Sequence, residues 1–300
     1  MRKRRILLSM ALVFMAILVV TTSAFAASEV VEDAVNGYFA DIPEGNSMVG
    51  TEEFVEMLKN GEDLFVLDIR SAEDFKAGHI DGAYNLPWAT GAIADNLDKL
   101  PGDQKIYIHC YSGQTANQLN GLLNFAGFDS VSVLYGWNFG ISKVEGYEEI
   151  TGDAVGEFSG PSDYKIEPTM KTAMEDYLYG LQDVSDTMFK NYMISEEMLN
   201  MSIESDADMM ILSIRQASDF SEGHIPGAVN IPWGDGMNEF FGQLPMDKKI
   251  ALYCYSGQTA GQTVAGLRLL GYDVVSLRGG MGTGRNNPLG WSNQGYEVVQ

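Results

Sequence analysis

The chain has 300 residues, of which 45% are hydrophobic, so it is long enough for two domains and too apolar for wholesale disorder. Asp and Glu number 41 against 19 Lys and Arg, a formal charge of −22. Such an acidic surface repels nucleic acid and anionic lipid head groups and gives small anions no long-range attraction, so nucleic acid is not an expected partner.

The first 26 residues have the pattern of a signal peptide. Basic MRKRR precedes the apolar stretch ILLSMALVFMAILVV, and Ala24-Phe25-Ala26 supplies the small residues of a cleavage site. The stretch is shorter than the roughly 20 residues of a membrane-spanning helix. We therefore expect residues 1–26 to be removed and the mature protein to be exported to the periplasm, cell envelope or extracellular space, without a membrane contact. An uncleaved N-terminal anchor is the alternative.

Residues 27–150 predict a first domain of alternating helices and strands. A helix is expected to begin at Thr51, whose hydroxyl would cap it ahead of two glutamates in the first turn. Short apolar runs predict buried strands over 64–69, 105–110 and 130–136, and leucines and alanines at helical spacing predict a helix over 115–126. Strands and helices in this order indicate a parallel sheet covered by helices.

Residues 151–193 predict a linker followed by a helix. The stretch TGDAVGEFSGPSDYKIEP contains the Gly, Pro and Ser of a loop. Met170 to Met193 then carries apolar residues at helical spacing, the pattern of a helix packed on a core. We expect this helix to dock the flanking domains together.

Residues 194–300 repeat the first domain. VLDIRSAEDFKAGHIDGAYNLPW (66–88) matches ILSIRQASDFSEGHIPGAVNIPW (211–233) at an offset of 145, and CYSGQTA occurs identically at 110–116 and 254–260. The second copy predicts a helix from Ser195, strands over 209–214, 249–254 and 273–279, and a helix over 259–270. The fold class predicted is therefore α/β, with two tandem domains, each a central parallel sheet flanked by helices.

The repeated loop contains the only two cysteines, Cys110 and Cys254. Each ends a parallel strand, where open α/β sheets place their sites, and each is followed at once by a helix. Backbone N–H groups at a helix N-terminus, a glycine that permits unusual backbone angles, and the hydroxyls of Ser112 and Thr115 would surround the sulfur. These surroundings favour an anion, either a nucleophilic thiolate or a terminal persulfide.

A disulfide is the other use of two cysteines in an exported protein. Cys110 and Cys254 lie in equivalent loops of separate domains, whereas a disulfide needs Cα atoms within about 7 Å. We therefore expect both thiols to be free.

Three motifs together resemble the rhodanese family. They are the stretch DIRSAEDFKAGHIDGAYNLP with its second copy SIRQASDFSEGHIPGAVNIP, the Cys-x-x-Gly loop, and the closing LRGGMGTGRNNPLGWSNQGY. The resemblance covers about 48–147 and 194–296 and implies a tandem rhodanese-like fold. It also implies transfer of sulfane sulfur from thiosulfate, a polysulfide or a persulfide to a thiol or cyanide through a cysteine persulfide. Neither a metal nor an organic cofactor is expected, and the expected partners are small sulfur donors and thiol acceptors.

Carried over residue by residue, the resemblance makes Cys110 and Cys254 the nucleophiles. The loops that would hold the transferred sulfur are Tyr111, Ser112, Gly113, Gln114 and Thr115 in the first domain and Tyr255, Ser256, Gly257, Gln258 and Thr259 in the second. The expected supporting residues are Asp68, which would accept hydrogen bonds from a neighbouring loop, and Arg70 and Arg215, which would pair with nearby acids. His79 and His224, in Gly-His-Ile turns, are expected to be structural.

Departures from the family pattern narrow the chemistry. Relatives that use thiosulfate often have a cation in the loop, and here CYSGQT has none. Thr115 and Thr259 stand where a Cys-x5-Arg phosphatase needs arginine, so phosphatase activity is not expected. The copies also differ from each other, because Ser213 replaces Asp68 and the first copy lacks the Gly-Gly and Trp ending, and these differences leave the dominant domain open. A non-catalytic binding module and an envelope thiol or sulfur-relay protein are the alternative functions.

Overall fold

The computed structural model describes residues 27–300. The predicted signal segment, residues 1–26, lies outside the described residues. Within residues 27–300 no helix has both the length and the apolar character needed to cross a membrane.

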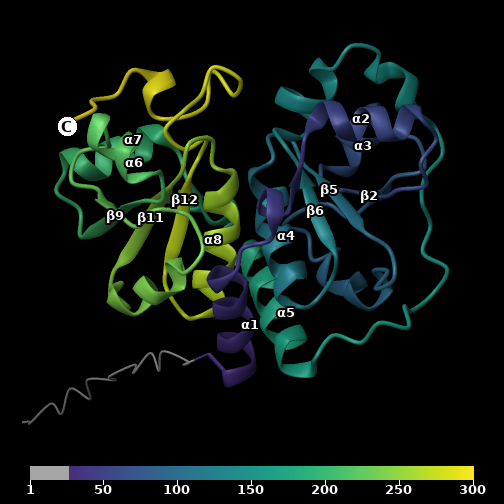
Figure 1. Ribbon diagram of the computed structural model, residues 1–300, viewed down its shortest axis with the longest axis horizontal. Coiled ribbons are helices and arrows are strands. Elements are labelled where there is room, and N and C mark those ends of the chain that lie inside the picture. Colours follow the sequence, from purple (N-terminus) through teal and green to yellow (C-terminus); the bar gives the residue numbers. More distant parts are fainter. Residues whose placement is uncertain (1–26) are drawn as a thin grey trace, which may run out of the picture.

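Two five-stranded sheets lie in two lobes of the molecule (Figure 1). The first contains β1 (Met48–Val49), β2 (Phe65–Asp68), β4 (Tyr84–Asn85), β5 (Ile106–His109) and β6 (Ser130–Val133). The second contains β8 (Met193–Ile194), β9 (Met209–Ser213), β10 (Val229–Asn230), β11 (Lys249–Tyr253) and β12 (Val274–Leu277). A separate antiparallel ribbon joins β3 (His79–Ile80) to β7 (Thr151–Gly152).

The two sheets have the same topology. The first has the order β1-β6-β5-β2-β4 and the second the order β8-β12-β11-β9-β10, and all neighbouring strands are parallel. Each strand therefore occupies the place of its sequence repeat. The predicted α/β fold with two parallel sheets flanked by helices is confirmed.

Helices cover both faces of each sheet. Those of the first unit are α2 (Thr51–Lys59), α3 (Ala72–Ala77) and α4 (Gln114–Phe125), and those of the second are α6 (Glu196–Glu204), α7 (Ala217–Glu222) and α8 (Gln258–Leu269). The cap predicted for α2 is wrong. Gly50 is the N-cap residue, while Thr51 is the first helical residue and its hydroxyl donates to the Leu134 carbonyl at 2.7 Å.

Two further helices, α1 (Glu29–Ala40) and α5 (Pro168–Asp183), precede the two sheets. Glu167 caps α5 by accepting a hydrogen bond from the Met170 N–H at 2.8 Å, and Pro168 occupies the first turn. The helix ends at Asp183, ten residues before the predicted end, because turns and a short 3-10 helix lead from there into β8.

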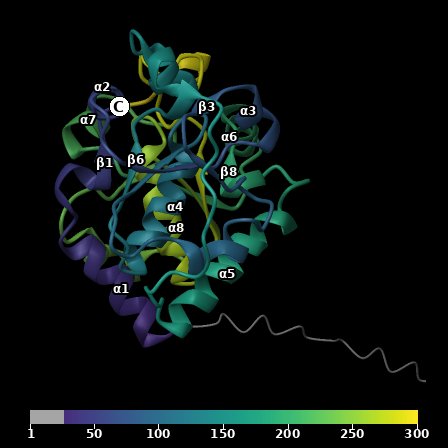
Figure 2. The same cartoon turned by 90° about the vertical axis from the view of Figure 1, so that its right-hand side faces the viewer.

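Each of these two helices packs against the unit that it does not precede. Phe39 of α1 contacts the second unit, with its ring 5.3 Å from Phe241 and 5.8 Å from Trp233. On α5, Tyr179 donates to Asp95 of the first unit at 2.6 Å. The two units are thus joined by two helices that each contact both units, with α1 and α5 lying together below α4 and α8 (Figures 1 and 2).

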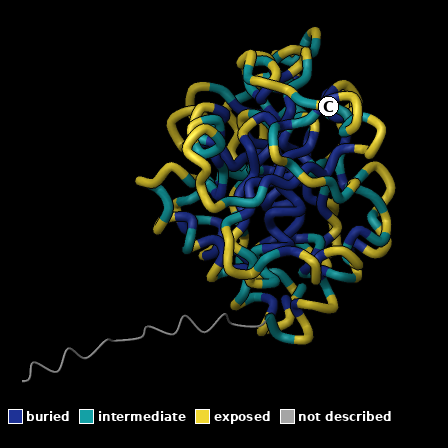
Figure 3. Tube along the Cα trace, turned by 90° about the vertical axis from the view of Figure 1, so that its left-hand side faces the viewer, coloured by how far each residue is buried: buried dark blue, intermediate teal, exposed yellow. Residues whose placement is uncertain are grey.

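One hydrophobic core runs through both units. It joins buried side chains of α1, α4, α5 and α8 to the inner faces of both sheets, and it forms the dark centre of Figure 3. Smaller cores lie on the outer faces, under α2 and α3 in the first unit and under α6 in the second. The strands β2 and β5 are buried along their whole length, as their continuous apolar sequences predicted.

Candidate active site

The two cysteines stand in equivalent positions at the carboxyl ends of the central strands. Cys110 follows β5 and Cys254 follows β11, and the helices α4 and α8 begin four residues later. Both thiols are free, and each cysteine is only 2% exposed. No disulfide links them, as their placement in separate units predicted.

A glycine in each loop directs its backbone N–H at the sulfur. Gly113 N lies 3.2 Å from Cys110 Sγ, and Gly257 N lies 3.1 Å from Cys254 Sγ. Both glycines have positive φ angles, 87° and 88°, which side chains rarely tolerate. In the first loop the Ala116 N–H also approaches the sulfur, at 3.4 Å. The sulfur therefore lies at the positive end of a helix, where donors favour its anionic form.

A second glycine packs against the backbone of each cysteine loop. The motifs of the sequence had not indicated it as a site residue. Gly136 and Gly280 lie where a Cβ would stand 2.5 Å from the Cys110 carbonyl oxygen and 2.6 Å from that of Cys254, respectively. The next residue in each copy, Trp137 or Met281, donates its N–H to the same cysteine carbonyl. The signal was present in the sequence, since each glycine follows its cysteine by 26 residues.

The loop tyrosines are half-exposed and bind the helix next to the loop. Tyr111 donates to Asp74 and accepts from the Ser71 N–H at 3.0 Å. Tyr255 makes the equivalent pair of contacts with Asp219 and the Gln216 N–H. The hydrogen bond from Tyr111 lowers the pKa of Asp74, and burial, followed by the bond to Asp219, raises the pKa of Tyr255.

The other predicted loop residues differ in what they contact. Within residues 27–300 no hydroxyl of the loops, from Ser112, Thr115, Ser256 or Thr259, makes a hydrogen bond to either sulfur. The Ser256 hydroxyl instead accepts from the Gln258 amide at 3.0 Å. The side chain of Gln114 points away from its own sulfur and into the other unit.

Asp68 and Arg70 form a buried ion pair beside the first loop. Their closest atoms, Nη2 and Oδ2, are 2.6 Å apart, and Asp68 also accepts from the Arg70 N–H at 2.9 Å. The Arg70 guanidinium lies 4.0 Å from the centre of the Trp137 ring. The backbone donor to the Asp68 carboxylate is thus Arg70, two residues further along the chain, and no hydrogen bond joins the Asp68 side chain to the Cys110 loop among residues 27–300.

The expected acid partner of Arg215 is not found. In the described part of the chain Arg215 makes no ion pair, and its guanidinium instead donates to the carbonyls of Gly223 and Asp219, both at 2.7 Å. The reason is the replacement of Asp68 by Ser213, whose hydroxyl only accepts from the Arg215 N–H at 3.3 Å.

The histidines of the Gly-His-Ile turns bind backbone. His79 contacts the carbonyls of Phe75 and Ala154 and stacks on the Phe75 ring, and His224 contacts the carbonyl of Phe220. No group of three or more metal-ligating side chains occurs among residues 27–300.

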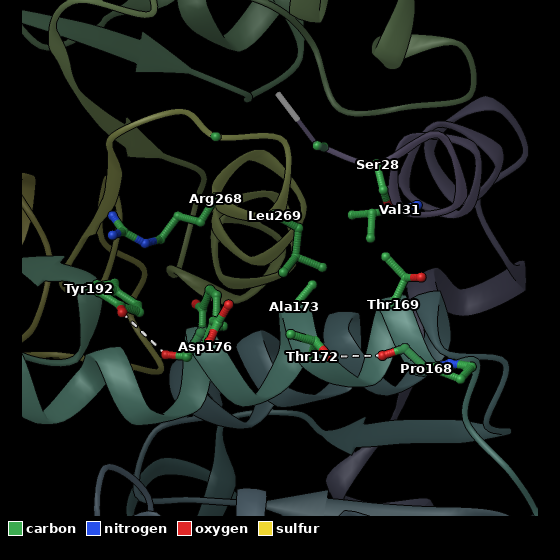
Figure 4. A pocket seen from close by; sticks show the side chains of 13 residues that line it. Ser28, Val31, Pro168, Thr169, Thr172, Ala173, Asp176, Tyr192, Arg268 and Leu269 are labelled. Atoms are coloured by element: carbon green, nitrogen blue, oxygen red, sulfur yellow. Dashed lines mark hydrogen bonds between the residues drawn. The ribbon is translucent and has the colours of Figure 1, made fainter. Parts of the chain in front are cut away.

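Two cavities lie near the interface and the first loop. One of about 490 Å³ lies outside the Cys110 loop and is lined by residues that include Arg70, Asp74, Tyr111 and Trp137. Another of about 720 Å³ lies between α1, α5 and the last turn of α8 (Figure 4). Because α8 begins beside Cys254 and rises about 1.5 Å per residue, this larger cavity is about 17 Å from the cysteine loops.

Comparison with known proteins identifies both units. The rhodanese-like domain family matches residues 50–139 and 195–283. A tRNA uridine(34) hydroxylase of Listeria monocytogenes is 38% identical over 106 residues, which are 34% of this chain and 32% of the hydroxylase. A sulfurtransferase of Allochromatium vinosum is 28% identical over 107 residues, 35% of this chain and 92% of that protein.

Among solved structures, a rhodanese-related protein from Thermoplasma volcanium is 28% identical and matches with a TM-score of 0.29 over 35% of this chain and 95% of its own. The matched region spans about a third of the length of the Listeria relatives. Because the family matches more than half of the chain, in two segments that each contain one of the cysteine loops, the chain belongs to the rhodanese-like domain family.

Proposed function

We propose that the protein is a sulfurtransferase in which Cys110 and Cys254 each carry sulfane sulfur as a persulfide. The observation that supports this is the glycine N–H aimed at each sulfur, at 3.2 and 3.1 Å, at the start of a helix. Such donors favour a thiolate nucleophile and, once sulfur is loaded, the anionic terminal persulfide.

Each transfer exchanges one S–S bond for another. The cysteine thiolate attacks the outer sulfur of the donor, a new S–S bond forms, and the donor's bond breaks. Its electron pair leaves on a thiolate from a persulfide or polysulfide, or on sulfite from thiosulfate. An acceptor thiolate or cyanide then attacks the outer sulfur of the cysteine persulfide and releases the cysteine as a thiolate. Neither step needs a metal, an organic cofactor or an external oxidant.

The donor is a persulfide or polysulfide rather than thiosulfate. No Lys or Arg lies between Tyr111 and Thr115, and the side chain that binds Tyr111 is the carboxylate of Asp74. A small dianion finds no cation in this loop to offset its charge. A singly charged or neutral donor binds with a smaller electrostatic penalty. The entry that we propose for the acceptor thiol of the first domain is the 490 Å³ cavity beside Tyr111, the residue that follows Cys110.

Hydroxylation of tRNA, for which the Listeria relatives are named, is not the activity that we propose for this chain. They share one unit of about 106 residues with it. With a formal charge of −22 the chain has no electrostatic attraction for RNA.

Intact-protein mass spectrometry tests the proposal. The protein is treated with polysulfide or with thiosulfate and compared with Cys110→Ser and Cys254→Ser. We expect addition of one sulfur atom per competent cysteine, loss of that addition in the matching variant, and discharge by an acceptor thiol. If one variant takes up more sulfur than the other, the domain of its remaining cysteine is the more active one. The absence of any adduct from reduced protein would contradict the proposal.

A binding module without transfer activity is the second candidate, and one observation favours it. Only 2% of each cysteine is exposed, as is typical of inert thiols. Alkylation at neutral pH separates the two candidates, because an inert buried thiol reacts slowly even without a sulfur donor present.

We also propose that residues 1–26 direct export. The support is their sequence, a basic start, an apolar stretch and small residues before Ala27. N-terminal sequencing of protein recovered from the envelope or medium is expected to begin near Ala27, and recovery of full-length protein only from membranes would instead indicate an anchor.

A further inference from the structure

Two buried glutamines cross the interface between the units. Gln114, the first residue of α4, donates from Nε2 to Ser276 Oγ at 2.8 Å and to the Leu277 carbonyl at 2.9 Å. Its Oε1 accepts from the Gly279 N–H at 3.1 Å. Every hydrogen-bonding atom of this amide is therefore used by the other unit.

Gln258 makes the reciprocal contact. It is the first residue of α8, and its Oε1 accepts from the Tyr135 N–H at 2.9 Å. Tyr135 and Gly279 are equivalent positions of the repeat, 144 residues apart. The two crossings are thus related by the same internal symmetry as the cysteine loops.

Each glutamine contacts the part of the other unit that holds the cysteine. Gly279, bound by Gln114, immediately precedes Gly280 and Met281, which pack on and hydrogen-bond the Cys254 carbonyl. Gln114 also lies against Gly257, whose Cβ position would be 2.7 Å from the amide carbon. This glycine supplies the N–H that points at Cys254 Sγ.

The same holds in the other direction. A Cβ on Gly113 would lie 2.6 Å from Gln258 Oε1, and the Gly113 N–H is the donor to Cys110 Sγ. Tyr135, which Gln258 binds, precedes the Gly136 and Trp137 that cover the Cys110 loop. Each loop is therefore held on two sides by a side chain that belongs to the other cysteine's helix.

We propose that Gln114 and Gln258 are positioning residues that act across the interface, so that Gln114 sets the reactivity of Cys254 and Gln258 sets that of Cys110. Removing an amide frees the loop glycine that it packs against and weakens the N–H contact to the sulfur of the other unit. The inference deepens the proposed function, because it names what holds each sulfur site in its geometry, but it predicts thiol reactivity that is measurable without any sulfur donor.

The test is the alkylation rate of each cysteine, measured separately. Iodoacetamide labelling of the full chain is followed across pH by mass spectrometry of the two cysteine peptides, in the parent protein, Gln114→Met and Gln258→Met. Methionine keeps the length of the side chain and removes its amide. Because the Gly257 N–H contact to the Cys254 sulfur is weakened, we expect the Cys254 rate in Gln114→Met to fall about tenfold at neutral pH. The Cys110 rate in the same variant should change less than about twofold.

Gln258→Met should slow Cys110 more than Cys254, although the Cys254 loop loses the hydrogen bond from Gln258 to Ser256. Gln118→Met is the matched control, since Gln118 is also buried on α4 and its amide contacts Asn191 and Tyr177 instead of a cysteine loop. It should change neither alkylation rate. The second cysteine in each molecule reports folding, so general damage would change both rates together.

An effect of Gln114→Met on Cys110 alone, or an equal effect on both cysteines, would overturn the inference. If polysulfide forms no adduct but the crossed effect on alkylation is present, the proposed transferase activity fails and the positioning role stands.

Discussion

Asp68 and Ser213 occupy equivalent positions but leave their neighbouring arginines in different states. Arg70 is buried and its charge is balanced by Asp68 at 2.6 Å, whereas Arg215 has two carbonyl oxygens and the Tyr255 ring but no carboxylate partner in the described chain. Breaking a buried ion pair leaves one charge without compensation and is costly. The first unit therefore depends on its carboxylate in a way that the second does not.

Substitution of Asp68 by Asn tests this difference. We expect Asp68→Asn to lower the free energy of unfolding by about 3 kcal/mol, because Arg70 keeps its charge at a buried site. Ser213→Ala removes only a hydrogen bond of 3.3 Å and should cost less than about 1 kcal/mol. Denaturant unfolding followed by fluorescence gives both values, and similar losses for the two variants would contradict this account.

His109 is a second feature found only in the first unit. It is fully buried, neither ring nitrogen has a hydrogen-bond partner within residues 27–300, and Asp68 Oδ2 lies 3.5 Å from Nε2. Burial lowers the pKa of His109, and the nearby carboxylate opposes this only in part. Its counterpart Tyr253 is also buried, with its pKa raised above 10.0, so the second unit has no titration here near neutral pH.

This pKa shift predicts a loss of stability in mild acid. Below about pH 6.5 the unfolded chain protonates His109 while the folded chain does not, so the free energy of unfolding falls as pH falls toward the folded pKa. The slope from this one group is at most about 1.4 kcal/mol per pH unit. His109→Phe lacks this contribution. The difference in the free energy of unfolding between the two proteins should therefore change with pH below about pH 6.5 and stay constant above it. Parallel curves for the two proteins between pH 5 and 7 would exclude the effect.

At the scale of elements, α4 and α8 run parallel and in close contact. Gly257 lies against Gln114, Gly261 against Asn117 and Gly121 against Ala265, so the contacts advance in the same direction along both helices. Both N-termini, and with them both sulfur loops, are therefore at the same end of the interface. The glycines permit this approach, because a Cβ on Gly261 would stand 2.5 Å from the Gln114 carbonyl oxygen.

Alanine at the two helix glycines should have unequal effects. Gly261→Ala meets backbone and must separate the helices, so we expect it to cost about 1–3 kcal/mol in the free energy of unfolding. At Gly121 the closest atoms, the Ala265 methyl and the Gln262 Cα, are both 3.3 Å away, and the better helix propensity of alanine offsets these contacts to within about 1 kcal/mol. Equal stabilities in denaturant unfolding would mean that the contact at Gly261 does not limit the approach.

Much of the fold could be predicted from local sequence. Most of the features that could not be predicted lie at the interface between the two units. The apolar runs over 64–69 and 105–110 predicted β2 and β5, and the identical loops predicted equivalent sites. The docking of α5 between the two units was expected from the sequence, whereas the place of α1 was not, because an apolar stripe shows that a helix packs but not on which unit. In the same way, the motif CYSGQTA placed Gln114 beside Cys110 in sequence, whereas its amide serves Cys254 through contacts between residues about 165 positions apart.

At the scale of the whole molecule, two opposing fields act on a substrate anion. The N-termini of α4 and α8 meet at the sulfur loops and present partial positive charge at short range. Residues 27–300 carry 41 acidic and 15 basic side chains, which repel an approaching anion at long range. Only the long-range field is screened strongly by salt, because the loops are buried.

The balance of these fields predicts a salt dependence that differs between an anionic donor and an uncharged reagent. Raising ionic strength from about 0.01 to about 0.15 M shortens the screening length from about 30 to about 8 Å. The second-order rate of sulfur loading from thiosulfate, a dianion, should therefore rise by at least about twofold. The rate of alkylation of the same cysteines by iodoacetamide, which is uncharged, should stay constant and controls for effects of salt on the protein. A thiosulfate rate that falls with salt would instead require a cationic contact at the loop mouth. Because neither copy of CYSGQT supplies one, that result would move the anion site to a side chain outside both loops.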